Sequence, residues 1–158
     1  MSSFIKLTEY KNNIILKLII NENLIKALIN HDSDFINQLL PDNFQPISLI
    51  YSQIFPYRFV PSIETEPKCF ITMSFSNYKY INNIFKSGIC SFYIICHKSL
   101  ICTDIGLRYD YILDQIDTMF NNKKDVGSFN LILDNGGDLF INDNYFGSMI
   151  SYKFTDFQ

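Results

Sequence analysis

The chain lacks the short motifs that identify phosphate-binding loops, dinucleotide-binding folds and zinc proteases. No G-x-x-x-x-G-K-[ST], G-x-G-x-x-G or H-E-x-x-H pattern occurs in its 158 residues. Its two histidines, His31 and His97, stand in no metal-ligand motif. Because no ordered catalytic set is present either, we predict that the chain is not an enzyme and that it needs neither a cofactor nor a metal ion.

Positive charge is also scarce. Thirteen Lys and Arg residues against sixteen Asp and Glu residues give a net charge of -3 at pH 7. Tight binding to phosphates requires a basic patch or stripe, and the composition gives no support for one. The negative net charge is compatible with a protein that does not bind DNA tightly.

Long apolar runs are missing as well. The stretch Ile14–Ile20 is interrupted by Lys17 and is much shorter than the roughly 20 residues that a membrane helix needs. No targeting segment is visible. We therefore expect a soluble protein that is made in the cytoplasm and has no membrane partner.

The four cysteines have no C-x-x-C spacing. Cys69, Cys90, Cys96 and Cys102 lie in or beside apolar, strand-like runs, where cysteine behaves as a small hydrophobic residue. We predict buried free thiols. A zinc site formed by Cys96, His97 and Cys102 is the alternative, and it is disfavoured because neighbouring residues of a strand point to opposite faces.

The length predicts one domain over residues 1–158, with a helical N-terminal region at residues 1–40. We expect Asn21 or Asn23 to separate two helical pieces, and Asp32 or Ser33 to cap a short third piece. The helical apolar pattern is formed by Ile14, Ile15, Leu18, Ile19, Leu24, Ile25, Leu28 and Ile29.

All five prolines fall within residues 41–67, which predicts an extended, proline-rich arm. Its most informative part is Ile54–Pro61 (Ile-Phe-Pro-Tyr-Arg-Phe-Val-Pro). Pro56 and Pro61 exclude a helix interior and a central strand, yet the segment carries five large apolar side chains that need cover. The arm packs either on its own sheet or in a groove of a neighbouring subunit, and the sequence leaves both open.

Residues 68–158 are predicted to contain the sheet and one further helix. The alternation over 68–75 indicates a strand, and Ile89–His97 is apolar on both faces, which is typical of a strand covered on both sides. Between them, residues 76–88 are interpreted as a polar connection. Thr103 or Asp104 is predicted to cap the helix, which we expect to end near Asn121 with an apolar face that includes Ile105.

The C-terminal part is predicted to be a meander of short strands. Gly127 opens a strand at 129–133, and the tetrapeptide at 134–137 (Asp-Asn-Gly-Gly) indicates a tight hairpin turn. A return strand at 139–141, a second turn at 144–147 and a last strand at 148–154 follow. The fold class is therefore α+β: an antiparallel sheet of about four to five strands with an N-terminal helical region and one further helix packed on it.

Few polar residues stand out as functional candidates. His97 is interpreted as a polar cap at the sheet edge. Asp110, Asp114 and Asp117 lie on one helix face, where two carboxylates can hold a divalent cation, although a solvated face is the interpretation we favour. Arg58 and Arg108 are the only arginines, and arginine suits bidentate pairs at interfaces. Together with the arm they give a predicted interface made of Phe55, Pro56, Tyr57, Arg58, Phe59, Pro61 and Arg108.

The order of these segments resembles the neck and tail-terminator (tail-to-head joining) proteins of long-tailed bacteriophages. The resemblance is carried by Ile54–Pro61, by His97–Asp110 leading into the helix 111–121, by the closing strand Tyr145–Tyr152 and by the helix before residue 30. It covers most of the chain, and it is a match of layout more than of a diagnostic signature. The helical N-terminus is longer than in that family.

The resemblance implies a structural virion protein that forms a closed ring, commonly six-fold, at the head–tail junction. Such a ring caps the tail tube, joins it to the head-side connector and leaves a channel through which DNA passes without sequence-specific binding. The implied partners are further copies of the chain, the tail tube protein and the connector or other neck proteins. Ring closure requires a heterologous interface, for which the arm and the sheet edges are the expected donors.

Other functions are compatible with the same residues. The chain resembles other neck components, such as a head-completion or adaptor subunit, equally well. A small intracellular enzyme or ligand-binding domain would be indicated by a polar pocket around His97, Asp104 and Arg108. A third alternative is a phage accessory protein that binds a host partner and is missing from the particle.

Overall fold

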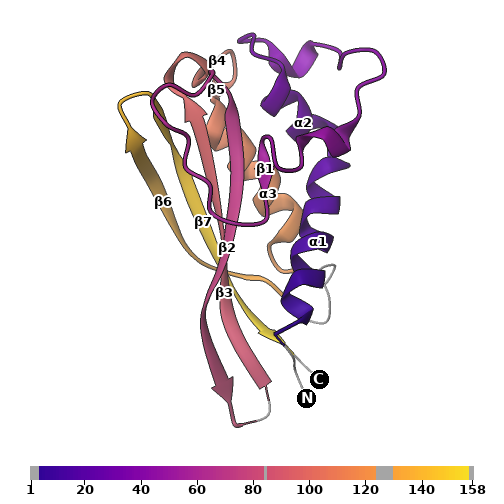
Figure 1. Ribbon diagram of the computed structural model, residues 1–158, viewed down its shortest axis with the longest axis vertical. Coiled ribbons are helices and arrows are strands. Elements are labelled where there is room, and N and C mark those ends of the chain that lie inside the picture. Colours follow the sequence, from indigo (N-terminus) through magenta and orange to yellow (C-terminus); the bar gives the residue numbers. More distant parts are fainter. Residues whose placement is uncertain (1–3, 84, 124–129, 157–158) are drawn as a thin grey trace.

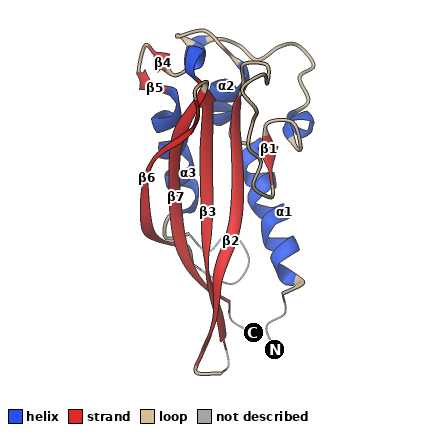
Figure 2. Ribbon diagram, turned by 60° about the vertical axis from the view of Figure 1, so that its left-hand side comes forward, coloured by secondary structure: helices blue, strands red, loops and turns tan. Residues whose placement is uncertain are grey.

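The computed structural model describes residues 4–83, 85–123 and 130–156. It consists of three helices and a five-stranded sheet, with the helices packed on one face of the sheet (Figures 1 and 2). The helices are α1 (Lys6–Ile19), α2 (Glu22–Ile29) and α3 (Arg108–Phe120), and the strands of the sheet are β1 (Ile54–Phe55), β2 (Cys69–Ile81), β3 (Phe85–His97), β6 (Ile132–Asn142) and β7 (Tyr145–Asp156). The predicted α+β class is confirmed.

The sheet has the strand order β1-β2-β3-β7-β6. Strands β2, β3, β7 and β6 are antiparallel, as predicted, whereas β1 pairs parallel to β2 through Ile54–Ile71 and Phe55–Thr72. The sheet is therefore mixed. The parallel strand is only two residues long because Pro56, directly after it, cannot donate to a ladder.

The main core lies between the helices and one face of the sheet. Alternate residues of β2 and β3 supply the sheet side of this core, which agrees with the period of two that the sequence shows. Its fully buried members include Ile14, Leu18, Leu24, Ile71, Met73, Cys90, Phe92, Ile112, Ile116, Phe120 and Tyr152. Phe92 of β3 stacks on Phe120 of α3 at 5.3 Å between ring centroids, so α3 is fixed directly on the centre of the sheet.

The N-terminal region contains two α-helices, as predicted. Asn21 caps α2, because its side-chain oxygen accepts a hydrogen bond from the backbone N–H of Leu24 at 3.1 Å. The third predicted piece is only a 3₁₀ turn, η1 (Phe35–Asn37). Among the described residues, no helix is both long enough and apolar enough to cross a membrane.

The third helix begins later than the sequence indicates. Thr103 was predicted as a cap, but it belongs to a small hairpin formed by β4 (Cys102–Thr103) and β5 (Gly106–Leu107). Its hydroxyl donates to the carbonyl of Gly106 at 2.6 Å and accepts from the N–H of Ile105 at 3.3 Å, which closes the turn. Ile105, predicted on the buried helix face, is 53% exposed as a result.

Two predicted connections are parts of strands. Residues 76–81 and 85–88 are not a loop: they extend β2 and β3 into a projecting ribbon, here called the β2–β3 ribbon (Figure 2), and the end of β7 still pairs with β3 from Lys86 to Gly88. Similarly, residues 134–137 are not a hairpin turn but part of β6. The polar residues mislead in both places because residues 76–81 and 134–137 are exposed to solvent and need no apolar alternation, whereas residues 85–88 are half-buried or buried.

The actual turn between β6 and β7 follows Asn142. The side-chain oxygen of Asn142 accepts from the N–H groups of Asn144 and Tyr145 at 2.9 and 3.0 Å, which places the turn slightly before the predicted 144–147. Strand β7 accordingly starts at Tyr145 rather than at residue 148. The strand predicted at 129–133 lies partly outside the described residues.

Candidate functional site

The arm packs on its own sheet, on the face that the helices leave free. Phe55 stacks on Phe59 with 4.3 Å between ring centroids, and Phe59 lies 5.2 Å from Phe70 of β2. Phe55, Phe70, Ile95 and Tyr145 form a second small core that the arm covers. Of the two alternatives that the sequence leaves open, packing within the protomer therefore accounts for Phe55 and Phe59.

Hydrogen bonds hold the continuation of the arm against the β6–β7 turn. The side chain of Asn142 donates to the carbonyl of Pro61 at 3.0 Å, and that of Asn144 donates to the carbonyl of Ile63 at 2.8 Å. The hydroxyl of Tyr145 reaches the carbonyls of Thr65 and Glu66 at 3.1 and 3.0 Å. The arm thus crosses the sheet from β1 to the end of β6 and is fixed at both ends.

Only part of the predicted interface is accessible. Tyr57 and Val60 are 52% and 58% exposed, and Arg58 is also exposed although its guanidinium stacks on the ring of Tyr93 at 3.6 Å. Pro56 is half-buried, and Pro61 is buried. Within Ile54–Pro61, the exposed residues are therefore Tyr57, Arg58 and Val60.

Arg108 does not occupy an interface position, and this prediction needs correction. The residue is 1% exposed, and all its donors point to backbone carbonyls of its own chain. Nε donates to Leu100 at 2.7 Å, and the two terminal nitrogens donate to the carbonyls of Ala27, Asn30, His31 and Asp32 at 2.9, 2.9, 3.3 and 3.0 Å. The guanidinium joins the start of α3 to the C-terminal end of α2, where a cation is favoured by the helix dipole.

The other polar candidates are not assembled into a catalytic or metal site. Asp104 is exposed in the β4–β5 turn while Arg108 is buried, so these residues do not form a shared polar pocket with His97. Nδ1 of His97 accepts from the N–H of Ser99 at 3.1 Å, and burial and Lys98 lower its pKa. Within the described part of the chain, no three His, Cys, Asp or Glu side chains are arranged to hold a metal ion.

The cysteines are free, as predicted, but not all are buried. Cys69, Cys90 and Cys96 are buried on the helix side of the sheet, whereas Cys102 is exposed. Burial raises the pKa of Cys96, and a hydrogen bond with Cys69 raises it further. Asp117, from the acidic face of α3, accepts a hydrogen bond from the hydroxyl of Tyr152 at 2.7 Å and so has a structural partner.

The sheet is open at two different edges. Strand β6 forms one edge, and its exposed side chains include Ile132, Leu133 and Phe140 at 47%, 48% and 68%. At the opposite edge, β1 covers only Ile71 and Thr72 of β2. In the part of the chain that the structure describes, β2 has no strand partner on that side from Met73 to Ile81.

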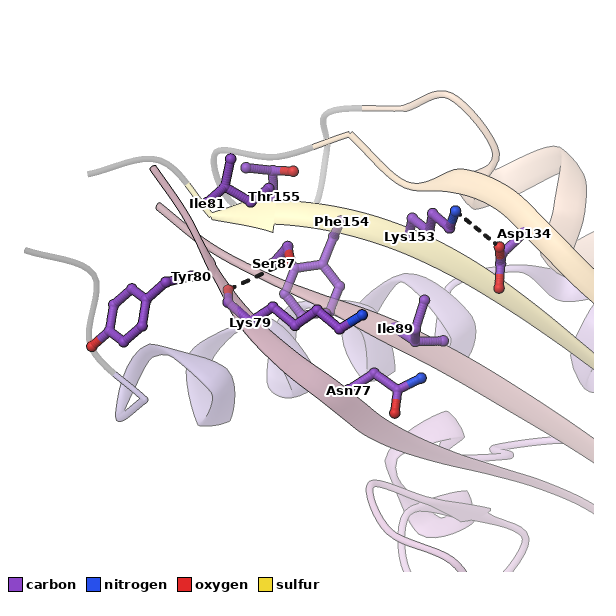
Figure 3. A pocket seen from close by; sticks show the side chains of 11 residues that line it. Asn77, Lys79, Tyr80, Ile81, Ser87, Ile89, Asp134, Lys153, Phe154 and Thr155 are labelled. Atoms are coloured by element: carbon purple, nitrogen blue, oxygen red, sulfur yellow. Dashed lines mark hydrogen bonds and ion pairs between the residues drawn. The ribbon is translucent and has the colours of Figure 1, made fainter. Parts of the chain in front are cut away.

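A hollow of about 470 Å³ lies where the β2–β3 ribbon leaves the sheet. Figure 3 shows residues from four strands around it: Asn77 and Lys79 of β2, Ser87 and Ile89 of β3, Lys153 and Thr155 of β7, and Asp134 of β6. Asp134 is the only acid in this lining, and its carboxylate pairs with the ammonium of Lys153 at 3.4 Å. By register, Ile89 and Lys153 pair directly on the side of the sheet away from the helices.

The open edges and this hollow do not follow from the sequence prediction, in which residues 76–88 are a loop and residues 134–137 a turn, although these segments supply most of the hollow. The signal that was available is the alternation of Tyr78 and Tyr80 with the polar residues Asn77 and Lys79, which has the period of a strand. It was obscured by the high content of Asn and Ser.

Comparison with known proteins gives one match. A family model described as YomW matches residues 21–154. No curated protein matches the chain, and no solved structure does.

Proposed function

The chain belongs to the YomW family of Bacillus phage-derived, SPbeta-like proteins, and we propose that it is a structural virion protein of the phage head–tail junction. In this proposal, copies form a ring that caps the tail tube, joins it to the head-side connector and leaves a channel for DNA. The protein is made in the host bacterial cytoplasm and acts in the particle, without enzymatic activity.

The observation that carries this proposal is the pair of unlike open edges. Along the sheet the strands alternate in direction, so that β2 and β7 run one way and β3 and β6 run the other. A copy rotated about an axis parallel to the strands therefore brings its β2 beside β6 in the antiparallel orientation. The sheet continues from one copy to the next without a change of pattern.

Such a contact is heterologous, because β6 of one copy meets β2 of another. Heterologous contacts produce rings when the rotation closes and open filaments when it does not. Unpaired strand edges are ready templates for this kind of pairing. The exposed apolar side chains at the start of β6, Ile132 and Leu133 at 47% and 48%, lie level with the open stretch of β2 and are then covered by the neighbouring copy.

The arm supports the same arrangement in a more limited way than the sequence predicts. Its buried residues cover their own sheet and its exposed residues, Tyr57 and Val60, remain for a contact with another subunit. Because β1 and the arm cover the start of β2, strand pairing between copies is confined to Met73–Ile81. We propose this stretch and β6 as the ring interface.

The test compares assembly of purified protein with that of an edge variant. Mixed with its tail tube and connector neighbours, the wild-type chain should form rings that are visible by electron microscopy and countable by native mass spectrometry. Leu133→Lys places a charge in the proposed contact, because Leu133 is 48% exposed and lies level with Phe75 of β2, and it should abolish the rings. Leu39→Lys is the matched control, since Leu39 is 87% exposed in the loop after η1 and belongs to neither β2 nor β6, and it should assemble normally.

Two results would overturn the proposal. One is a protein that stays monomeric with all neighbours present, or a ring that Leu133→Lys leaves intact. The other is absence of the chain from purified particles, which would favour an accessory protein that acts on a host partner.

A further inference from the structure

Charge is distributed unevenly along the molecule although the chain as a whole is acidic. Around the β2–β3 ribbon, the described side chains include Lys6, Lys11, Lys79, Lys86 and Lys153, against the acids Glu9 and Asp134. Contacts place the start of α1 here, because Phe4 packs on Tyr78 and Lys11 lies 5.4 Å from the ring centroid of Phe75. The ribbon end is therefore basic.

The opposite end, at the β4–β5 hairpin, is acidic. There the loops carry Asp32, Asp34, Glu64, Glu66, Asp104 and Asp143, with Lys68 and Lys98 as the nearby cations. Backbone hydrogen bonds tie these loops together, since the N–H of Asp104 donates to Ser33 and the N–H of Lys98 donates to Asn144. The overall charge of -3 thus hides two ends of opposite sign.

The hollow lies at the basic end and is lined by groups that donate hydrogen bonds. Two ammonium groups, on Lys79 and Lys153, reach it from different strands and flank Ile89 (Figure 3). The hydroxyl of Thr155 and the amide of Asn77 add neutral donors, whereas the hydroxyl of Ser87 donates to the carbonyl of Lys79 at 3.5 Å. Its single carboxylate, on Asp134, is occupied by Lys153, whose side chain is 67% exposed.

We infer that this hollow binds phosphate groups of a nucleic-acid backbone. Cations and hydroxyls on a sheet face, without a cavity shaped for a base, suit backbone contacts that position nucleic acid but do not read its sequence. The inference rests on the proposed function for the kind of nucleic acid, which is the duplex DNA that passes the ring.

The test measures binding of a fluorescent 20-base-pair DNA duplex by anisotropy as salt is varied, with the unassembled chain. Each phosphate contact contributes a slope of about 0.9 in log affinity against log salt. At 0.1 M salt, one contact therefore raises the affinity about eightfold relative to 1 M salt. Lys79→Gln should weaken binding by about eightfold and lower the slope by about one. Asp134→Asn frees Lys153 and should strengthen binding by a similar factor.

Lys98→Gln is the matched control, because it removes the same charge at the acidic end and should leave affinity and slope unchanged. Equal losses for Lys79→Gln and Lys98→Gln would overturn the inference, since the effect would then be one of net charge. Absence of DNA binding would overturn it as well.

A second arm titrates inorganic phosphate and anionic lipid vesicles in place of DNA. Binding of free phosphate or of vesicles by a chain that does not bind DNA would overturn the assignment to a nucleic-acid backbone. Because these measurements use the unassembled chain, failure of DNA binding and failure of ring assembly are separate results.

Discussion

Replacement of Arg108 by lysine tests whether this residue acts by charge or by the geometry of its donors. Both side chains carry one positive charge, but the guanidinium has five N–H donors in a fixed plane, whereas the ammonium has three. In the structure five carbonyl oxygens surround the guanidinium. The guanidinium also lies 4.6 Å from the ring centroid of Phe35.

The expected loss follows from the oxygens that lysine leaves without a donor. At least two of the five carbonyls lose their partner, and a buried acceptor without a donor costs about 1–3 kcal/mol. The bonds to Leu100 and Ala27 are buried, whereas those to Asn30, His31 and Asp32 are partly buried, so water can replace some donors there. We therefore expect Arg108→Lys to lower the free energy of unfolding by about 2–4 kcal/mol.

Urea unfolding followed by circular dichroism measures this change. Arg58→Lys is the control, because the exposed stack of Arg58 on Tyr93 is worth only about 0.5–1 kcal/mol. If Arg108→Lys were within about 0.5 kcal/mol of the wild type, the five carbonyl bonds would not be what joins α3 to α2. An interface role for Arg108, by contrast, predicts a loss of assembly with unchanged stability of the monomer.

Three further predictions concern the sheet and its thiols. Gly147→Ala should cost about 3 kcal/mol by thermal unfolding, because a Cβ there would collide with a backbone carbonyl of the adjacent strand, while Gly137→Ala, with no atom within 4 Å of the added Cβ, should be nearly neutral. Ellman's reagent should modify one thiol of the native chain, that of Cys102, and more than one equivalent would contradict the burial of the other three. Burial raises the pKa of Cys90 above its ordinary value of 9.0, and burial and a hydrogen bond to a carboxylate raise that of Tyr152. Since these groups ionise first in the unfolded chain, their contribution to stability should be constant below about pH 8, and stability should fall above about pH 9; a flat profile of urea midpoints between pH 8 and pH 10.5 would refute this.

The sequence was sufficient to predict the fold class because the core-facing residues keep the right periods. Strand 69–75 and strand 89–97 show a buried alternation or a continuous apolar run, and helix α2 is marked by the Asn21 cap. These signals come from residues that pack on the helices. Where a strand or helix contributes to the core, the spacing of its apolar residues predicts the secondary structure that it adopts.

The prediction failed where a strand has no core to face. Residues 76–81 and 134–137 lie in exposed strands, so their side chains are mostly polar. A polar composition of this kind predicts a loop or a turn. Gly136 and Gly137 gave the strongest false signal, because two glycines in sequence favour a tight turn but are also tolerated in an exposed edge strand with a register shift nearby. The role of Arg108 was equally hidden, since its carbonyl partners come from residues about 80 positions earlier.

The two proposals meet at one stretch of the chain. Lys79 lines the hollow and also belongs to the open edge of β2 that we propose as half of the ring interface. By register, β6 of a neighbour begins level with Ser76, so pairing of this edge holds the segment that leads to Lys79 and brings another strand close to the hollow. Because linked binding equilibria are reciprocal, a ring that binds DNA more tightly than the monomer does must itself be stabilised by DNA. The exposed end of β2, which the sequence predicts as a loop, would then be the part of the molecule where ring assembly and DNA binding influence each other.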